Sequence, residues 1–295
     1  MRDKAAYDTL KPMAISSWQQ ELRAVIREPQ ELLDKTGQGS ASPALAEAGL
    51  GAFPLRVPES YLRRIARGQT NDPLLRQVLP LAEEDIETPG YSDNPVGEFD
   101  KTAAPGLIRK YPGRVLLITT SVCAIHCRYC FRRHYPYNEN NPARENWMAA
   151  LETIRADQSI REVILSGGDP LTLGDAKLSS LIRELEAIPH LQWLRIHTRM
   201  PVVIPARITG ELVEIIAASR FKQTVVIHAN HPSEIDTEVA ASLSALHYAG
   251  IQLLNQSVLL RGVNDDVLVL TELSERLYAN HVLPYYLHML DPVAG

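Results

Sequence analysis

Cys123-Ala-Ile-His-Cys127-Arg-Tyr-Cys130-Phe-Arg-Arg-His134 contains every cysteine of this 295-residue chain. Thiolate is the soft ligand that iron and zinc select, and the C-x3-C-x2-C spacing allows three thiolates to converge on one metal centre. An iron–sulfur cube has four irons, so three thiolates leave one iron without a protein ligand. The stretch therefore predicts a [4Fe–4S] cluster with an open iron that can bind a substrate or cofactor, with Cys123, Cys127 and Cys130 as the ligands.

A structural zinc site is the simpler alternative, with His126 or His134 as the fourth ligand. Zinc ribbons usually use two separated ligand pairs, whereas this loop holds all its thiols together and follows a predicted buried strand. A disulfide framework is disfavoured by the odd cysteine count. The sequence shows no apolar signal segment and no apolar run long enough to cross a membrane, so we expect a cytoplasmic protein without a membrane partner.

Composition limits the remaining possibilities. The chain is 45 % hydrophobic with a formal charge of −5, and it has no repeat or low-complexity tract. These values predict a globular protein with a large core, and mild acidity argues against nucleic acid as a partner. Arg128, Arg132 and Arg133 form a local basic group that could still bind an anion.

From residue 111 to residue 295 short apolar runs alternate with helical stretches. This alternation predicts an α/β fold with a parallel sheet, in the form of a partial (β/α)6 barrel, because parallel neighbours need long crossover connections. The strands are expected at Val115–Thr119, Val163–Leu165, Leu194–His197, Thr224–Ile227, Leu253–Leu259 and Val282–Leu287. The helices are expected at Glu145–Ala156, Ala176–Ala187, Gly210–Ala218, Glu238–Tyr248 and Val267–Asn280.

Residues 1–110 are predicted to form a separate, mostly helical region that caps the barrel. One helix is expected to end before Pro29, a second to begin near Pro58 with Gly68 as its C-terminal cap, and a short third one to begin at Asp72-Pro73. The stretch from Glu83 to Pro95 reads as an exposed loop. No catalytic constellation is evident in this region.

Functional groups of such folds lie at the carboxyl ends of the strands, which is where the cysteine loop is predicted. Ser166-Gly167-Gly168-Asp169 follows the second strand, and paired glycines allow a ligand to approach the backbone closely. His197 and Arg199 after the third strand are weak signals. His228 and His231 after the fourth are three residues apart, a spacing more typical of hydrogen-bonded loop residues than of a metal site.

Several strings together identify a family resemblance. They are Leu55-Arg-Val-Pro58, Asp72-Pro-Leu-Leu-Arg-Gln-Val78, Cys127-Arg-Tyr-Cys-Phe-Arg-Arg-His134, Pro205-Ala-Arg-Ile-Thr209, Asn255-Gln-Ser-Val-Leu-Leu260 and Pro284-Tyr-Tyr-Leu-His288. With the cysteine motif, they resemble the radical S-adenosylmethionine (SAM) enzymes of the lysine 2,3-aminomutase family over nearly the whole chain. The likeness is greatest to the branch that supplies (R)-β-lysine for modification of elongation factor P. A free-standing aminomutase of β-lysine metabolism is the alternative within the family.

The resemblance implies a radical-SAM barrel, three cofactors and roles for named residues. Cys123, Cys127 and Cys130 match the ligands of the [4Fe–4S] cluster, and Ser166, Gly167, Gly168 and Asp169 match the element that holds the methionine amino group of SAM. Arg114 matches a residue that pairs with the phosphate of pyridoxal 5′-phosphate (PLP), and His228 and Gln256 match residues that line the cofactor pocket. Arg132 matches a ligand of the substrate carboxylate, and Asp291 matches a ligand of the lysine side-chain ammonium.

The resemblance also implies partners and one departure. We expect lysine as substrate, a flavodoxin-like electron donor, and a functional link to elongation factor P and its lysyl-ligase. The family's Schiff-base lysine for PLP lies beyond the sixth strand, and no lysine of this chain occupies that position. We therefore expect the chain to be C-terminally truncated. In this form it is expected to bind SAM and to fail to isomerise lysine. Two alternatives from other classes are a radical-SAM enzyme without PLP and a zinc module whose arginines bind an anionic partner.

Overall fold

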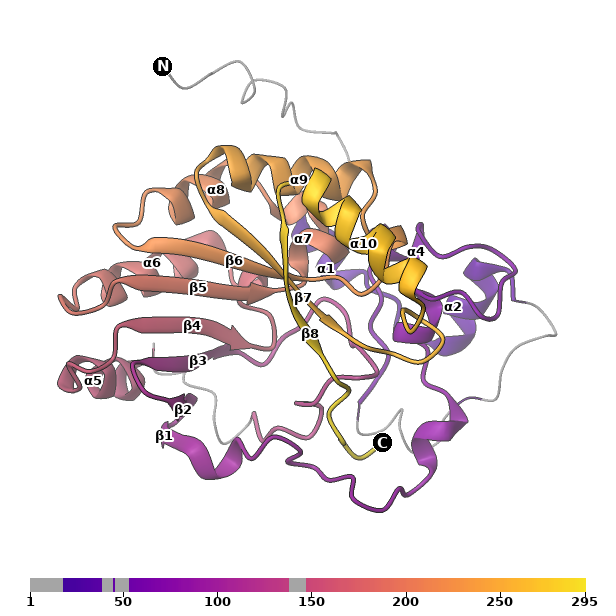
Figure 1. Ribbon diagram of the computed structural model, residues 1–295, viewed down its shortest axis with the longest axis horizontal. Helices are drawn as coiled ribbons and strands as arrows, with labels where there is room; N and C mark the ends of the chain where they lie inside the picture. The colour runs from indigo at the N-terminus through magenta and orange to yellow at the C-terminus, as the bar shows by residue number, and fades with distance from the viewer. Residues whose placement is uncertain (1–17, 39–44, 46–52, 138–146) are drawn as a thin grey trace.

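The computed structural model describes residues 18–38, 45, 53–137 and 147–295. Their centre is one eight-stranded sheet in which the strands follow one another in sequence order, β1 to β8. The strands β3 to β8 are parallel, and helices cover their outer face (Figure 1). This arrangement confirms the predicted α/β partial barrel.

The six parallel strands lie where the apolar runs predicted them, within two residues at each end. Their bounds are β3 Arg114–Thr120, β4 Glu162–Gly167, β5 Trp193–Thr198, β6 Lys222–His228, β7 Gln252–Val258 and β8 Leu283–His288. The register pairs Leu117 with Leu165, and Ile196 with Val225. These residues belong to the main core and are 0–1 % exposed, so one face of the sheet packs against helices along most of its width.

The five predicted helices between the strands are also present. They are α5 Met148–Ala156, α6 Asp175–Glu186, α8 Gly210–Ala217, α9 Thr237–Tyr248 and α10 Val267–Ala279, and a short α7 Met200–Val203 follows β5. Local sequence explains their starts: Thr209, Asp236 and Asp266 each accept a hydrogen bond from a backbone N–H in the first helical turn. No helix of the described residues is long and apolar enough to cross a membrane.

The described part of the N-terminal region is less helical than predicted, and the helix expected to end at Gly68 ends at Leu62. Helix α1 spans Trp18–Arg23, and α2 spans Pro29–Thr36 with its proline at the first turn, so Pro29 begins a helix instead of only following one. Helix α4 is short, Glu59–Leu62, and the third predicted helix is a 3-10 turn, η3 Leu75–Gln77. Two more 3-10 turns follow, η4 Ala82–Asp85 and η5 Phe99–Lys101.

Two antiparallel strands, β1 Thr102–Ala104 and β2 Leu107–Tyr111, extend the sheet beyond β3. The predicted boundary at residue 110 thus falls inside a strand of the sheet. Apolar residues of the N-terminal region, including Leu55 and Leu74, belong to the same buried cluster as those of the barrel. The two parts share one core.

Strands β4 and β5 run toward the N-terminal segments drawn in purple in Figure 1, so their carboxyl ends face that region. Contacts between the two parts agree with this view. The backbone N–H of Arg128 donates to the Gln77 carbonyl oxygen at 2.9 Å, and the His126 N–H donates to the Arg56 carbonyl at 3.1 Å. The cysteine loop therefore lies between the carboxyl ends of the strands and the N-terminal region.

Candidate active site

The cysteine loop begins where β3 ends and is packed against the end of β4. The Gly168 N–H donates to the Thr120 carbonyl oxygen at 2.7 Å, and the Asp169 N–H donates to the Val122 carbonyl at 2.7 Å. A Cβ atom on Gly168 would lie 2.7 Å from the Val122 carbonyl carbon, and Gly167 has φ +118°. Both positions therefore require glycine. The glycine pair brings the predicted SAM element directly against the segment that precedes Cys123.

The three cysteines are part-buried, form no disulfide with one another and are close enough to influence one another. Burial raises the pKa of Cys123, and the neighbouring Cys130, Asp169 and Cys127 raise it further. Burial and Cys127 raise the pKa of Cys130 to about 11. The three thiols are thus near enough to affect one another's ionisation, and a metal centre bound there would compensate the charge of their thiolates.

One carboxylate of the N-terminal region, Glu84, pairs with two of the loop's arginines. Arg128 donates from Nε to Oε1 of Glu84 at 2.8 Å, and Arg133 donates from Nη2 to Oε2 of the same residue at 3.0 Å. Arg56 donates from Nε to the Cys123 carbonyl oxygen at 3.0 Å. The basic group predicted as an anion site is thus engaged with protein, and the loop is fixed by side chains distant in sequence.

Arg132 has a buried carboxylate partner that the sequence did not reveal, Glu98. Its Nε and Nη2 atoms donate to the two Glu98 oxygens at 2.7 and 2.8 Å, and Nη1 donates to Ser166 Oγ at 2.9 Å. Burial works against both charges. Their attraction outweighs it, raising the pKa of Arg132 and lowering that of Glu98. The structure therefore brings Arg132 and Ser166 together and adds Glu98 to the candidate site.

Asp291 follows β8 and belongs to the same electrostatic neighbourhood. Burial raises its pKa, and the nearby His288 and Lys110 act in the opposite direction. Lys110 also lies 3.9 Å from a Glu98 oxygen, which connects the surroundings of Asp291 to those of Arg132. The two predicted substrate ligands are thus close to one polar group of side chains, Glu98 and Lys110.

Asp169 is buried and both its oxygens are occupied. Oδ1 accepts from Thr198 Oγ1 at 2.6 Å and from the Leu171 N–H at 3.0 Å, while Oδ2 accepts from the Arg199 N–H at 2.7 Å. Burial raises its pKa despite these hydrogen bonds. In this structure, Asp169 ties the end of β4 to the segment after β5.

Arg114 lies at the opposite end of the barrel from the cysteines. It begins β3, and its Nε is 3.3 Å from Glu162 Oε2 at the start of β4. Glu162 also accepts a hydrogen bond from Arg195 Nε at 2.9 Å. Arg114 is four residues before Ile118, the partner of Ser166 in the register, which corresponds to about 13 Å along the strand.

His228 and Gln256 are direct register partners at the ends of β6 and β7. Burial lowers the pKa of His228 to about 3, and its Nε2 lies 3.5 Å from the Tyr129 hydroxyl of the cysteine loop. Burial also lowers the pKa of His197 to about 3, and its buried Nε2 has no partner within the described part of the chain. These imidazoles are neutral groups at the inner surface of the sheet.

Arg199 contacts the cysteine loop directly, although its sequence position gave only a weak signal. Its Nη1 donates to Cys127 Sγ at 2.7 Å, and its Nη2 donates to Gln77 Oε1 and Glu234 Oε2. Gln77 belongs to one of the strings that carry the family resemblance, which was the available signal for it. The N-terminal region, which showed no catalytic constellation, supplies Gln77, Glu84 and Glu98 to this site.

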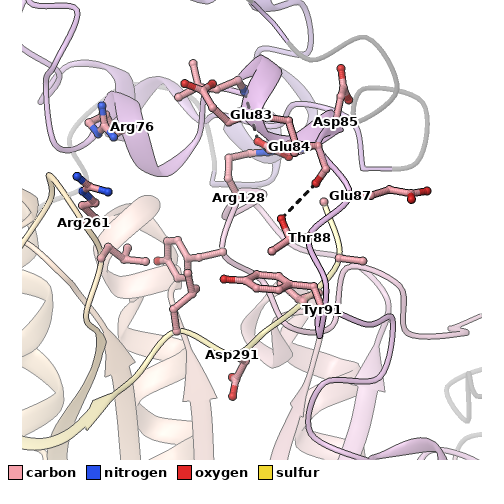
Figure 2. Close-up of a pocket in the computed structure, with 18 of the residues that line it drawn as sticks. Arg76, Glu83, Glu84, Asp85, Glu87, Thr88, Tyr91, Arg128, Arg261 and Asp291 are labelled. Carbon is pink, nitrogen blue, oxygen red and sulfur yellow. Dashed lines mark hydrogen bonds and ion pairs between the residues drawn. The ribbon is translucent and has the colours of Figure 1, made fainter.

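A cleft of about 850 Å³ opens beside the loop. Its lining includes Tyr129 and residues of the 83–91 segment, the 260–263 segment after β7 and the C-terminal segment 290–295. Figure 2 shows Arg76 and Arg261 on one side, and Glu83, Glu84 and Asp85 on the other. Asp291 projects from the C-terminal segment below them.

Within the described ranges, no group of three or more His, Cys, Asp or Glu is arranged to hold a single metal ion. His126 Nδ1 lies 2.6 Å from the Pro54 carbonyl oxygen, and His134 Nε2 lies 2.8 Å from that of Ala294. One ring nitrogen of each predicted fourth zinc ligand is therefore already engaged. A cubane binds each thiolate through a different iron, so its ligands need not meet at one point.

Comparison with known proteins places these features in a family. Residues 117–271 match the Radical SAM superfamily. The chain is 45 % identical over 288 residues to the L-lysine 2,3-aminomutase of Escherichia coli (strain K12), covering 97 % of this chain and 84 % of the relative. It is 44 % identical over 279 residues to that of Haemophilus influenzae, covering 95 % and 82 %. The Clostridium subterminale L-lysine 2,3-aminomutase is 38 % identical over 242 residues, covering 82 % and 58 %.

Proposed function

The chain belongs to the L-lysine 2,3-aminomutase family of the radical SAM superfamily, and we propose that it converts L-α-lysine to (R)-β-lysine. Enzymes of this family use a [4Fe–4S] cluster, SAM and PLP, which supply the radical and the amino-group migration that side chains alone do not perform. The proximity of three part-buried thiols at the carboxyl ends of the parallel strands is the observation that carries the proposal.

In this proposal, Cys123, Cys127 and Cys130 hold the cluster. The residues fit that group, because three soft donors share one loop and two of them have pKa values raised by burial and by each other. A bound cation removes this penalty by stabilising the thiolates. The zinc alternative has less support, since no single-ion arrangement occurs among the described residues.

Ser166, Gly167, Gly168 and Asp169 form the proposed cradle for SAM. The glycine pair keeps the backbone of this element free of side chains beside the cysteine loop. Asp169 has both oxygens hydrogen-bonded to protein, so its proposed contribution is to hold the cradle against β5, and any contact with the methionine ammonium would add to those bonds.

Arg132 and Asp291 are the proposed ligands of the two ends of lysine. Glu98 fixes the Arg132 guanidinium through two of its nitrogens, which leaves Nη1 directed at Ser166 in the cradle. That edge is where we place the substrate carboxylate. Burial raises the pKa of Asp291, and an ammonium bound there would act in the opposite direction by favouring the carboxylate.

PLP would lie along the inner surface of the sheet. We propose that Arg114 contacts its phosphate at the amino end of β3 and that His228 and Gln256 line the other end of the pocket, nearer the cysteine loop. A guanidinium suits a phosphate, although Arg114 must exchange or share its present partner, Glu162, to bind it. The neutral His228 adds no charge to this surface.

The biological setting is proposed from the same likeness. We infer that the product serves post-translational β-lysylation of elongation factor P together with its lysyl-ligase, and that a flavodoxin-like protein donates the electron. Three free cysteines and a low-potential donor suit the reducing cytoplasm, where we place the enzyme. Loss of the β-lysyl mass from elongation factor P in cells lacking this chain would test the link, and unchanged modification would contradict it.

An anaerobic assay with L-lysine, SAM, PLP and dithionite tests the activity. The match covers 84 % of the Escherichia coli relative, so the assay uses this chain and a chimaera that adds the C-terminal segment of that relative. We expect β-lysine from the chimaera. If the chimaera holds its cluster and cleaves SAM but forms no β-lysine, the aminomutase assignment is rejected. A radical-SAM enzyme of another type is then favoured.

A further inference from the structure

Cys127 differs from the other two thiols because a charged side chain donates to its sulfur. Arg199 Nη1 lies 2.7 Å from Cys127 Sγ, and the Arg199 side chain is only 6 % exposed. Cys130 receives a backbone N–H from Arg132, which carries no charge at the donor. In the part of the chain that the structure describes, a full positive charge is therefore held inside the protein against one proposed cluster ligand.

Arg199 is fixed from three directions. Its backbone N–H donates to Asp169, and its Nη2 donates to Gln77 Oε1 at 2.7 Å and Glu234 Oε2 at 2.8 Å. The guanidinium carbon also lies 5.4 and 5.7 Å from the ring centroids of Tyr61 and Tyr129. These contacts restrain the guanidinium and keep its Nη1 directed at the Cys127 sulfur in the structure.

Hydrogen bonds to cluster sulfurs and local charge set the reduction potential of an iron–sulfur centre. An added electron increases the negative charge on the thiolate sulfurs, and a donor with positive charge stabilises that state more than the oxidised one. Burial strengthens the effect because little water screens it. The Glu234 carboxylate acts in the opposite direction, but it lies on the far nitrogen of the guanidinium.

We infer that Arg199 is a positioning residue that raises the reduction potential of the cluster by donating a charged hydrogen bond to Cys127. The inference rests on the proposed function, because it requires the cluster on these cysteines. The step involved is a one-electron reduction of the [4Fe–4S] centre by a low-potential reductant, with no proton transferred. By this contact the protein makes the cluster easier to reduce before SAM is cleaved.

The test measures the midpoint potential of the reconstituted protein by redox titration, followed by the electron paramagnetic resonance signal of the reduced cluster. Arg199→Gln should lower the equilibrium constant for reduction at least tenfold, which corresponds to about 59 mV for one electron. Glu234→Gln should shift the potential upward, because it removes a negative charge and keeps the donor. Opposite shifts from two contacting residues are not expected of a purely structural role.

Arg207→Gln is the matched control. Arg207 is also fully buried and pairs with a carboxylate, at 2.7 Å from Asp175, but it contacts no cysteine. Its substitution should reduce stability and leave the potential unchanged. An equal shift in Arg207→Gln, or no shift in Arg199→Gln, would overturn the inference.

Iron and sulfide analysis separates the two levels of the argument. Wild-type protein that cannot hold a four-iron cluster would refute the proposed function and this inference with it. Wild-type protein with a cluster, and Arg199→Gln with a cluster of unchanged potential, would refute the inference alone. If Arg199→Gln does not retain a cluster, Glu234→Gln decides: an upward shift supports the inference, and an unchanged or lower potential rejects it.

Discussion

Substitution of Glu98 by Gln should destabilise the protein far more than an ordinary surface substitution. The Glu98 side chain is 6 % exposed and accepts two hydrogen bonds from Arg132, whose side chain is 9 % exposed. Gln keeps the shape but removes the charge, and its amide nitrogen would face a guanidinium N–H. Loss of one partner from a buried ion pair costs about 3–5 kcal/mol because the other charge is left uncompensated.

For a chain of this size, 1 kcal/mol lowers Tm by roughly 2 °C, so Glu98→Gln should lower Tm by about 6–10 °C. Glu59→Gln is the control. Glu59 pairs with Lys35 at 3.4 Å, but the two side chains are 52 % and 43 % exposed, and such a pair contributes at most about 1 kcal/mol. Thermal and urea unfolding followed by tryptophan fluorescence would measure both. Equal, small shifts in the two variants would refute the reasoning.

Four further outcomes follow from the same geometry. The pKa of Glu98 is lowered in the folded protein. Its contribution to stability is therefore present above the unfolded pKa of about 4.3 and is lost as the pH falls through the lower folded pKa. In Glu98→Gln, the acid limb of a curve of unfolding free energy against pH should be flatter than in the wild type. Gly168→Ala should lower Tm and cluster content, because its Cβ would overlap the carbonyl group of Val122, whereas Gly174→Ala, with nothing within 4 Å, should change stability by less than about 1 kcal/mol in calorimetry. Cys127→Ser should abolish the cluster, and full iron and sulfide content in that variant would contradict the ligand assignment. In the chimaera, Asp291→Asn should lower kcat/KM for lysine by a factor corresponding to about 2–5 kcal/mol while cluster content is unchanged, as steady-state kinetics beside iron analysis would show.

The barrel was predictable because its signals are local. Buried strands such as β3 contain a continuous apolar run, here Val115–Ile118, and the helices between the strands show apolar residues at helical spacing. Pro29 was ambiguous by nature, since proline both follows helices and begins them, and here it begins α2. The β1–β2 hairpin gave little signal because only Leu107 and Ile108 of β2 are buried.

The candidate site was predictable only where residues adjacent in sequence act together. The cysteine motif and the Ser166–Asp169 element are of this kind. The pairings of Arg132 with Glu98 and of Arg199 with Glu234 join residues 34 and 35 positions apart, and that of Gln77 with Arg199 joins residues 122 apart. No local pattern predicts which carboxylate meets which arginine, because the folded chain decides it.

The cysteine loop is held by protein groups as well as by its proposed metal centre. Glu84 binds two of its arginines, Arg56 holds its first carbonyl, and Gln77 holds its backbone at Arg128. Zinc fingers show the opposite design, in which the metal itself supplies the folding energy and the apo chain is unfolded. Here side chains and backbone groups distant in sequence also hold the loop, so the metal is not the sole source of its fixed conformation.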